Sequence, residues 1–167
     1  MTQDLFKQVT SHWVAPTEFP HIEGRVAIDL ETCDTDLIKH GPGWPTKRGK
    51  VIGIAIATSS FKAYYPIDHD GGGNMDKKKV IKYIKNICDN EKIEKIFHNA
   101  QYDIGWLSVL GINIKGRVHD TMVAAALIDE NRYSYTLNSI VHEYLGEFKN
   151  ETKLKEAADA FGVDAKS

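Results

Sequence analysis

Two acidic residues, Asp29 and Glu31, stand two positions apart in a largely apolar run, residues 25–32 (RVAIDLET). Side chains alternate between the two faces of a β-strand, so a strand here places both carboxylates on one face, about 6.6 Å apart along the chain. Like charges on an apolar strand are costly unless a positive charge lies between them, and a divalent cation that prefers oxygen ligands meets that need. The pair therefore predicts a metal site, while a solvated pair on a frayed strand is the alternative for so short a motif.

A second group of polar residues lies in residues 97–103 (FHNAQYD), where an apolar segment ends and a helical pattern begins. Asn99 can cap that helix, and Asp103 falls in its first turn, where the helix dipole favours a carboxylate. His98 stands at the end of the preceding segment. Each residue also has a structural alternative: an ordinary first-turn acid, a cap, and a core histidine.

Three aromatic residues are candidates for contacts with nucleic acid. Trp44, Tyr102 and Trp106 carry rings that can stack on terminal bases. Aromatic residues at helical spacing are also typical of a protein core, and this alternative stays open.

The loop of residues 43–50 (GWPTKRGK) carries three basic side chains, Lys47, Arg48 and Lys50. Its glycine spacing does not fit a phosphate-binding loop, and Val51 stands where Ser or Thr should hold magnesium. A solvated hairpin loop is the favoured interpretation. Its basic side chains can still contact a DNA backbone, because phosphate contacts need only positive charge near the strand.

The elements that must position these residues follow from the spacing of apolar residues. Short runs rich in β-branched residues predict strands at 25–32, 51–58 and 62–67, and the connections between them are too short for helices, so these strands should be antiparallel neighbours. An amphipathic helix follows behind Asn74 or Asp76 as the cap. The remaining predicted elements are a strand at 95–98, a helix at 100–110, an irregular strand at 112–118, and helices at 120–128, 137–145 and 153–161. This order predicts an α/β mixed sheet covered by helices.

Composition limits the class of protein. With 167 residues, 42% of them hydrophobic, we expect a lead-in of residues 1–24 and one globular domain, residues 25–167. The formal net charge of −2 does not indicate a strongly basic nucleic-acid-binding protein. Cys33 and Cys88 form no C-x-x-C pair, which argues against a disulfide scaffold or a structural zinc site. Without a signal peptide or an apolar run of ~18 residues, the sequence favours the cytoplasm.

Three motifs in order carry a resemblance to a known family: DLET at 29–32, HNAQYD at 98–103 and HDTM at 119–122. Together they resemble the DEDD superfamily of 3′-5′ exonucleases, and the chain is most similar to the proofreading domain of family A DNA polymerases, the DNA polymerase I type of bacteria and phages. The resemblance covers residues 25 to about 148, and the tail 151–167 also resembles phage members. It implies an RNase H-like (DnaQ-like) fold and a location in a bacterial or phage-infected cell.

The resemblance also implies roles for individual residues. Asp29 and Glu31 would bind a pair of metal ions, Mg²⁺ or Mn²⁺, and Asp103 would bridge or support the pair. Asp120 matches a position that opens a helix beside the site, and its capping role is also what its place before Thr121 predicts. Weaker candidates for contacts with nucleic acid are Thr32, His98, Asn99, Tyr102 and Trp106.

The chain departs from the family in its third motif, a Tyr followed by the fourth carboxylate on one helix. Tyr64 and Asp68 have the right spacing, but they lie in a strand broken by Pro66 and precede the second motif, so we interpret the match as chance. Asp159 and Asp164 have no Tyr one helical turn earlier. We therefore expect the chain to end before this motif, and to have weak or no activity by itself.

Three hypotheses about function follow. The first is the exonuclease part of a DNA polymerase that acts on the 3′ end of single-stranded DNA, joined to or bound by a polymerase domain. The second is an RNA-trimming enzyme of the RNase D type, which the shared motifs do not separate from the first. The third is a non-catalytic module that keeps the fold to bind nucleic acid or a polymerase. None of the three involves a membrane.

Overall fold

The computed structural model describes residues 14–147 of the chain. Residues 15–137 form one compact unit, which carries the sheet and all the residues of the candidate site. Residue 14 and residues 138–147 belong to a second unit. The helix predicted at 153–161 lies outside the described residues.

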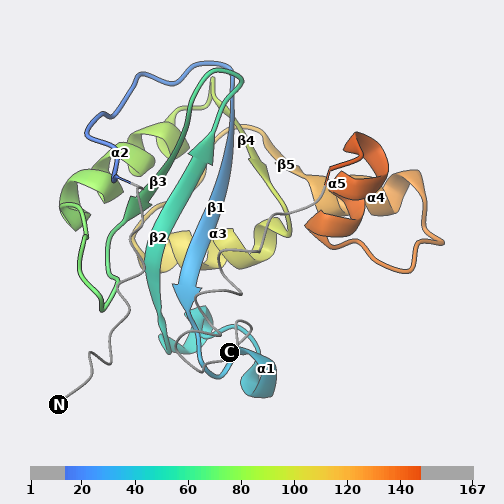
Figure 1. The fold of residues 1–167 in the computed structure, drawn as a ribbon, viewed down its shortest axis with the longest axis horizontal. Coiled ribbons are helices and arrows are strands. Elements are labelled where there is room, and N and C mark those ends of the chain that lie inside the picture. The colour runs from blue at the N-terminus through green and yellow to red at the C-terminus, as the bar shows by residue number, and fades with distance from the viewer. Residues whose placement is uncertain (1–13, 148–167) are drawn as a thin grey trace, which may run out of the picture. The chain divides into compact units, whose positions relative to one another are not determined.

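The compact unit is built on a five-stranded sheet in the order β3-β2-β1-β4-β5 (Figure 1). The strands are β1 (Arg25–Cys33), β2 (Lys50–Ala57), β3 (Lys62–Pro66), β4 (Glu94–Phe97) and β5 (Val118–Asp120). The first three pair antiparallel, whereas β4 pairs parallel with β1, and β5 pairs parallel with β4. This is the mixed sheet that the sequence predicted.

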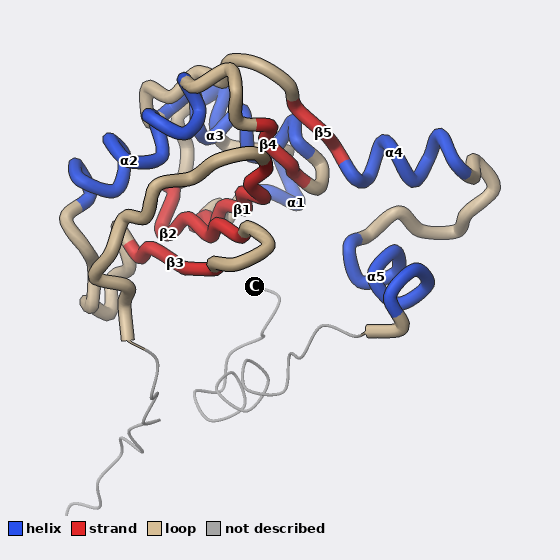
Figure 2. The backbone as a smooth tube through the Cα atoms, turned by 90° about the horizontal axis from the view of Figure 1, so that it is seen from above, coloured by secondary structure: helices blue, strands red, loops and turns tan. Residues whose placement is uncertain are grey.

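Helices connect these strands and follow them along the chain. They are α1 (Leu37–His40), the short 3-10 helix η1 (Trp44–Thr46), α2 (Lys77–Asp89), α3 (Ala100–Val109), α4 (Thr121–Ile128) and α5 (Leu137–Leu145). Helices α2 and α3 lie on the same face of the sheet (Figures 1 and 2). The sequence predicted a loop where α1 and η1 lie, because helices of four and three residues are too short to show a period. Within residues 14–147, no helix has the length and apolar character needed to cross a membrane.

The core of the compact unit lies between the sheet and the helices α2 and α3. Along β1, the apolar Val26, Ile28 and Leu30 are buried on the face that the helices cover. Helix α2 buries an apolar stripe at helical spacing and begins at Asp76, whose carboxylate accepts the N–H groups of Lys78 and Lys79. This cap is one of the two that the sequence offered.

The part of the lead-in that belongs to the compact unit, residues 15–24, packs on β3 and α2. Phe19 stacks on Tyr65 with 5.5 Å between ring centroids, and it meets Tyr83 edge to face at 5.0 Å. The Tyr83 hydroxyl donates to the Pro20 carbonyl at 2.8 Å. Such aromatic pairs stabilise the fold beyond the effect of burying their rings. The contacts of Phe19 and Tyr83 therefore attach the lead-in to the edge of the core.

The irregular strand predicted at 112–118 is wrong for most of its length, because β5 begins only at Val118. Lys115 donates its N–H to the Cys88 carbonyl at the end of α2. Gly116 has a φ of 75°, and a Cβ there would meet the backbone of Glu91. The segment before β5 therefore packs against the end of α2. Its apolar residues pack in the core but do not pair with the sheet.

A β-bulge interrupts the pairing of β1 with β2 directly after Glu31. At this point β2 carries one extra residue, Ile52, and its carbonyl accepts the N–H groups of both Ile67 (2.9 Å) and Asp68 (3.1 Å). Bulges are frequent beside active sites, because the extra residue re-aims the chain. Here it fixes the segment that follows β3 close to the end of β1.

The close packing of η1 on α3 gives a first prediction. A Cβ on Gly105 would overlap the indole ring of Trp44, whereas a Cβ on the exposed Gly71 would meet no atom within 4 Å. Alanine inside a helix normally stabilises by about 1 kcal/mol relative to glycine. We expect Gly105→Ala to lower the free energy of unfolding by about 2 kcal/mol, because the indole must move. Urea unfolding of this variant and of the control Gly71→Ala measures the difference, and a stabilised Gly105→Ala contradicts the packing.

Candidate active site

Asp29 and Glu31 form an acidic face on β1. Both side chains are exposed, whereas Ile28 and Leu30 between and beside them are buried on the opposite face. This is the alternation that the sequence predicted for a strand. The two carboxylates are therefore presented together, near the end of the strand.

Asp103 joins the acidic face from α3. It lies in the first turn of that helix with 3% of its surface exposed, and its Oδ1 accepts the N–H of Leu30 at 3.0 Å. Leu30 lies beyond Ala27, the last residue of β1 that pairs with β4. A buried N–H needs a partner, and the Asp103 carboxylate provides it where the neighbouring strand has diverged. The third carboxylate is thereby fixed at the residue between Asp29 and Glu31.

The pKa of Asp103 reflects this position. Burial raises it to about 7, the hydrogen bond from Leu30 acts against the rise, and the negative charge of Asp29 adds to it. A carboxyl group with a pKa near neutrality, buried beside other carboxylates, is typical of functional sites. A bound cation would favour its charged form.

The donor set at this place fits a hard divalent cation by its chemistry. It consists of three carboxylates, from Asp29, Glu31 and Asp103, and carboxylate oxygens are the ligands that magnesium prefers. Within residues 14–147, no group of three or more His, Cys, Asp or Glu side chains stands close enough to hold a metal ion. Two of the carboxylates thus lie on β1 and the third reaches that segment from α3, without forming a closed cage there.

Asp120 holds the start of two helices. As the cap of α4, its Oδ1 accepts from Met122 at 2.9 Å and from Val123 at 3.3 Å. The same carboxylate accepts the N–H groups of Asn99 (3.1 Å) and Ala100 (2.7 Å) at the start of α3. Burial acts to raise the pKa of Asp120, but the four backbone hydrogen bonds hold it below its ordinary value. The cap predicted from sequence is present, and it also ties α3 to α4.

The side chains of Asn99 and His98 make contacts other than those expected from their motif. Asn99 stands before α3 in the left-handed region with a φ of 66°, but its side chain makes no capping hydrogen bond, because Asp120 provides the cap. The Nδ1 atom of His98 shares a hydrogen bond of 2.9 Å with the Thr121 hydroxyl. That hydroxyl also donates to the Phe97 carbonyl, so His98 links β4 to α4. This contact favours the structural alternative for His98.

A groove beside the acidic face gathers other candidates. The hydroxyl groups of Tyr102 and Thr32 lie 2.7 Å apart in a hydrogen bond. Tyr102 in turn lines a hollow of about 420 Å³. Its lining residues are Pro42, Trp44, Pro45, Asn99, Gln101 and Tyr102. Trp106 is fully buried, so its ring belongs to the core and is not available to a base.

The basic residues of the 43–50 loop are largely engaged within the protein. Arg48 lies 3.6 Å from the Asp36 carboxylate, and Lys50 lies 2.7 Å from that of Asp70. Exposed ion pairs are weak, so these side chains remain able to exchange partners with a phosphate.

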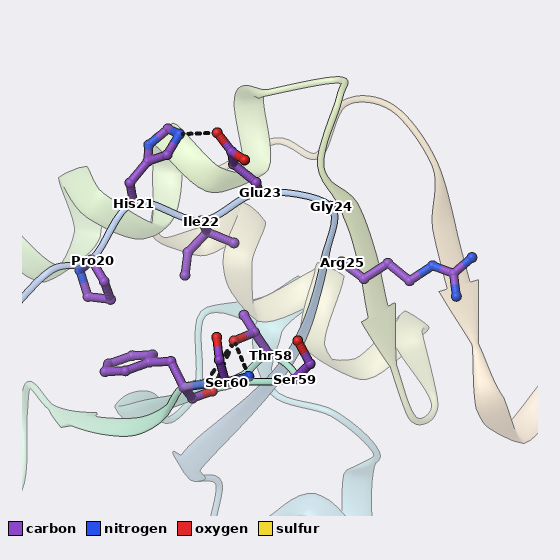
Figure 3. A pocket seen from close by; sticks show the side chains of 10 residues that line it. Pro20, His21, Ile22, Glu23, Gly24, Arg25, Thr58, Ser59 and Ser60 are labelled. Atoms are coloured by element: carbon purple, nitrogen blue, oxygen red, sulfur yellow. Dashed lines mark hydrogen bonds and ion pairs between the residues drawn. The ribbon is translucent and has the colours of Figure 1, made fainter.

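Figure 3 shows a pocket of about 670 Å³ at the start of β1, near the opposite end of the strand from Glu31. The pocket lies between the lead-in and the turn at 58–61, and an ion pair of 3.2 Å joins His21 to Glu23 at its edge. None of the three candidate carboxylates lines this pocket. The size of a pocket therefore does not identify the candidate active site.

Tyr64 lies beside the acidic face, although the sequence motifs did not predict it there. Its ring lies over Gly53, the partner of Glu31 on β2. Burial raises the pKa of its hydroxyl to about 12, and the negative charge of Glu31 adds to the rise. The pairing register of β1, β2 and β3 could have predicted this position, because residues in register across antiparallel strands share a face.

Comparison with known proteins shows the family of the chain. A family model described as 3′-5′ exonuclease matches residues 13–161. The DNA-directed DNA polymerase of Pseudomonas phage M6 is 37% identical over 97% of this chain and 26% of its own length. DNA polymerase I of Pseudomonas aeruginosa is 26% identical over 72% of this chain and 13% of its own length. The chain thus spans about a quarter or less of these relatives, and the predicted resemblance is confirmed.

Solved structures share the fold. Escherichia coli RNase D, an exoribonuclease involved in structured RNA processing, superposes with a TM-score of 0.56 at 20% identity, covering 78% of this chain and 30% of RNase D. Brucella melitensis NrnC with bound Mg²⁺ gives a TM-score of 0.56 at 17% identity, covering 78% of this chain and 57% of NrnC. The predicted RNase H-like α/β fold is confirmed.

The raised pKa of Asp103 predicts a pH dependence of stability. Its folded-state pKa lies above the value of 3.8 for a free side chain, so the folded state holds the proton more tightly. The Asp103 contribution to the free energy of unfolding therefore falls as pH rises from about 4 to about 7, and above that it costs at most about 4 kcal/mol.

Asp103→Asn tests this, because the amide cannot ionise and keeps an oxygen for the Leu30 N–H. We expect the variant to become more stable than the parent chain as pH rises from 4.5 to 8, measured by urea unfolding without divalent cations. Parallel stability curves for the two proteins would contradict the expected pKa.

Proposed function

The chain belongs to the 3′-5′ exonuclease family, and we propose that it hydrolyses the terminal phosphodiester bond at the 3′ end of single-stranded DNA. The observation that carries the proposal is the contact of the Asp103 carboxylate with the Leu30 N–H, between the exposed Asp29 and Glu31. Two carboxylates on β1 and a third that contacts the same segment from α3 suit the binding of divalent cations at a phosphodiester bond.

We propose Asp29, Glu31 and Asp103 as the residues that hold two ions, Mg²⁺ or Mn²⁺. When bound, such ions stabilise the negative charge that develops in phosphodiester hydrolysis and lower the pKa of a coordinated water. Asp29 and Glu31 are exposed and can take up cations from solvent. Asp103 is held by the Leu30 N–H and by the fixed start of α3, so its carboxylate is oriented before any ligand arrives.

The groove next to the acidic face suits the terminal nucleotide. Tyr102 and Trp44 line it with aromatic surface, on which a base can stack. Asn99 adds an amide at the groove edge, and the Thr32 hydroxyl lies against that of Tyr102. We propose that these four residues bind the 3′ end and direct its last phosphodiester toward the carboxylates.

The matched relatives are polymerases several times longer than this chain. We propose that the chain acts as the proofreading part of such an enzyme, joined to a polymerase domain or bound to a separate polymerase chain. It would then work in the cytoplasm of a bacterial or phage-infected cell. Asp159 and Asp164, the remaining acidic candidates from the sequence, lie outside the described residues.

Cleavage of a labelled oligonucleotide tests the proposed activity. We expect single-stranded DNA to be shortened from its 3′ end in the presence of Mg²⁺ or Mn²⁺, at a low rate for this chain alone. Asp29→Ala should lower the rate by at least about 100-fold, because one ligand of a cooperative set is lost. Glu130→Ala removes an exposed carboxylate elsewhere and should leave the rate unchanged.

The same assay separates the other functions. Equal rates for the parent chain and Asp29→Ala would overturn the proposal. Faster cleavage of an RNA oligonucleotide of the same sequence would assign the chain to RNA trimming. No cleavage of either nucleic acid, even after the segment that follows the matched region in the Pseudomonas phage M6 relative is fused to the chain, would leave a binding module.

A further inference from the structure

Tyr64 shares the face of the sheet that carries the acidic residues. It pairs with Ala55 of β2, and Ala55 pairs with Asp29 of β1. Residues directly opposite one another in antiparallel strands point to the same side. The three strands therefore present Asp29 and Tyr64 on one surface, with only the small Ala55 between them.

The Tyr64 ring reaches from this row toward Glu31. Glu31 is opposite Gly53 on β2, and a Cβ on Gly53 would overlap the Tyr64 ring and its hydroxyl. The missing side chain of Gly53 thus leaves the space that the phenol ring fills. The effect of the Glu31 charge on the pKa of Tyr64 agrees with this placement of the hydroxyl beside the carboxylate.

His69 holds the Tyr64 hydroxyl from the other side. The hydroxyl oxygen and the His69 Nε2 atom share a hydrogen bond of 2.5 Å. The His69 backbone is itself clamped by Asn74, whose side-chain oxygen accepts its N–H and whose side-chain amide donates to its carbonyl, both at 2.7 Å. Because the His69 backbone is held in this way, the imidazole extends from a fixed point of the loop to the tyrosine hydroxyl.

The loop that carries His69 is anchored to the bulge beside Glu31. The Ile52 carbonyl binds the N–H groups of Ile67 and Asp68, and Lys77 holds the Asp68 carboxylate at 2.6 Å. One irregularity of the sheet therefore sets the position of the acidic residue and of the loop that supports Tyr64.

We propose that Tyr64, held by His69, is a positioning residue that orients the Glu31 carboxylate for metal binding. The inference rests on the proposed function, because it gives Glu31 the role of a metal ligand there. Polar partners of metal ligands fix the orientation of those ligands, and their removal typically weakens metal affinity or activity 10- to 100-fold. A phenol hydroxyl is a hydrogen-bond donor that a carboxylate oxygen can accept.

The neighbouring tyrosine provides a matched control. Tyr65 lies on the opposite face of β3, is fully buried, and its hydroxyl lies 3.3 Å from the Glu18 carbonyl of the lead-in. Tyr65→Phe removes the same atom from the same strand without touching the acidic face. A general effect of losing a tyrosine hydroxyl therefore appears in both variants, whereas an effect on Glu31 appears only in Tyr64→Phe.

Calorimetric titration with Mn²⁺ alone tests the proposal without relying on cleavage. We expect Tyr64→Phe to weaken Mn²⁺ binding about tenfold, and Tyr65→Phe to leave it within twofold of the parent chain. The midpoints of thermal unfolding should fall no further for Tyr64→Phe than for Tyr65→Phe. His69→Gln should weaken binding in the parent chain but add nothing in the Tyr64→Phe background, because its effect passes through that hydroxyl.

The outcomes separate this proposal from the proposed function. Unchanged Mn²⁺ affinity in Tyr64→Phe overturns the role of Tyr64, even if the parent chain cleaves DNA and Asp29→Ala does not. A tenfold loss supports it, even if no cleavage is found. Failure of the parent chain to bind Mn²⁺ overturns both.

Discussion

The hydrogen bond from the Leu30 N–H to Asp103 is the contact on which the site depends. It occurs where β1 has left its parallel partner, so the unpaired strand edge and the first turn of α3 satisfy one another. Asp120 then fixes the start of α3 against that of α4 through four backbone hydrogen bonds. The position of one carboxylate is thus set by backbone groups of three elements, which makes it insensitive to side-chain motion at the surface.

This arrangement costs free energy, because the Asp103 carboxyl is buried and lies near the negative charge of Asp29. Burial raises the pKa of Asp103 to about 7 and the negative charge of Asp29 adds to the rise, whereas four backbone N–H donors hold the pKa of Asp120 below its ordinary value. The pKa values of these two aspartates are therefore shifted in opposite directions. One is a stable structural anion, and the other changes its charge with pH or with a bound cation.

Much of the site followed from local sequence. Alternation on a strand placed Asp29 and Glu31, and the pattern of a helix start placed Asp103. The strand register placed Tyr64, but that depends on a bulge and on an antiparallel partner, which no short motif contains. Trp106 shares helical spacing with Tyr102, and only the packing of α3 decides that one is buried and the other lines the groove.

The two sides of the acidic face also differ in how far apart their residues lie in the chain. Tyr64 and His69 are five positions apart and belong to the β2–β3 hairpin and its exit loop, whereas Leu30 and Asp103 are separated by 73 positions. Short-range contacts close with little loss of chain entropy, and long-range contacts close late. The hairpin side can therefore form first in folding, and the arrival of α3 completes the carboxylate set, so cation affinity becomes a property of the fully folded chain.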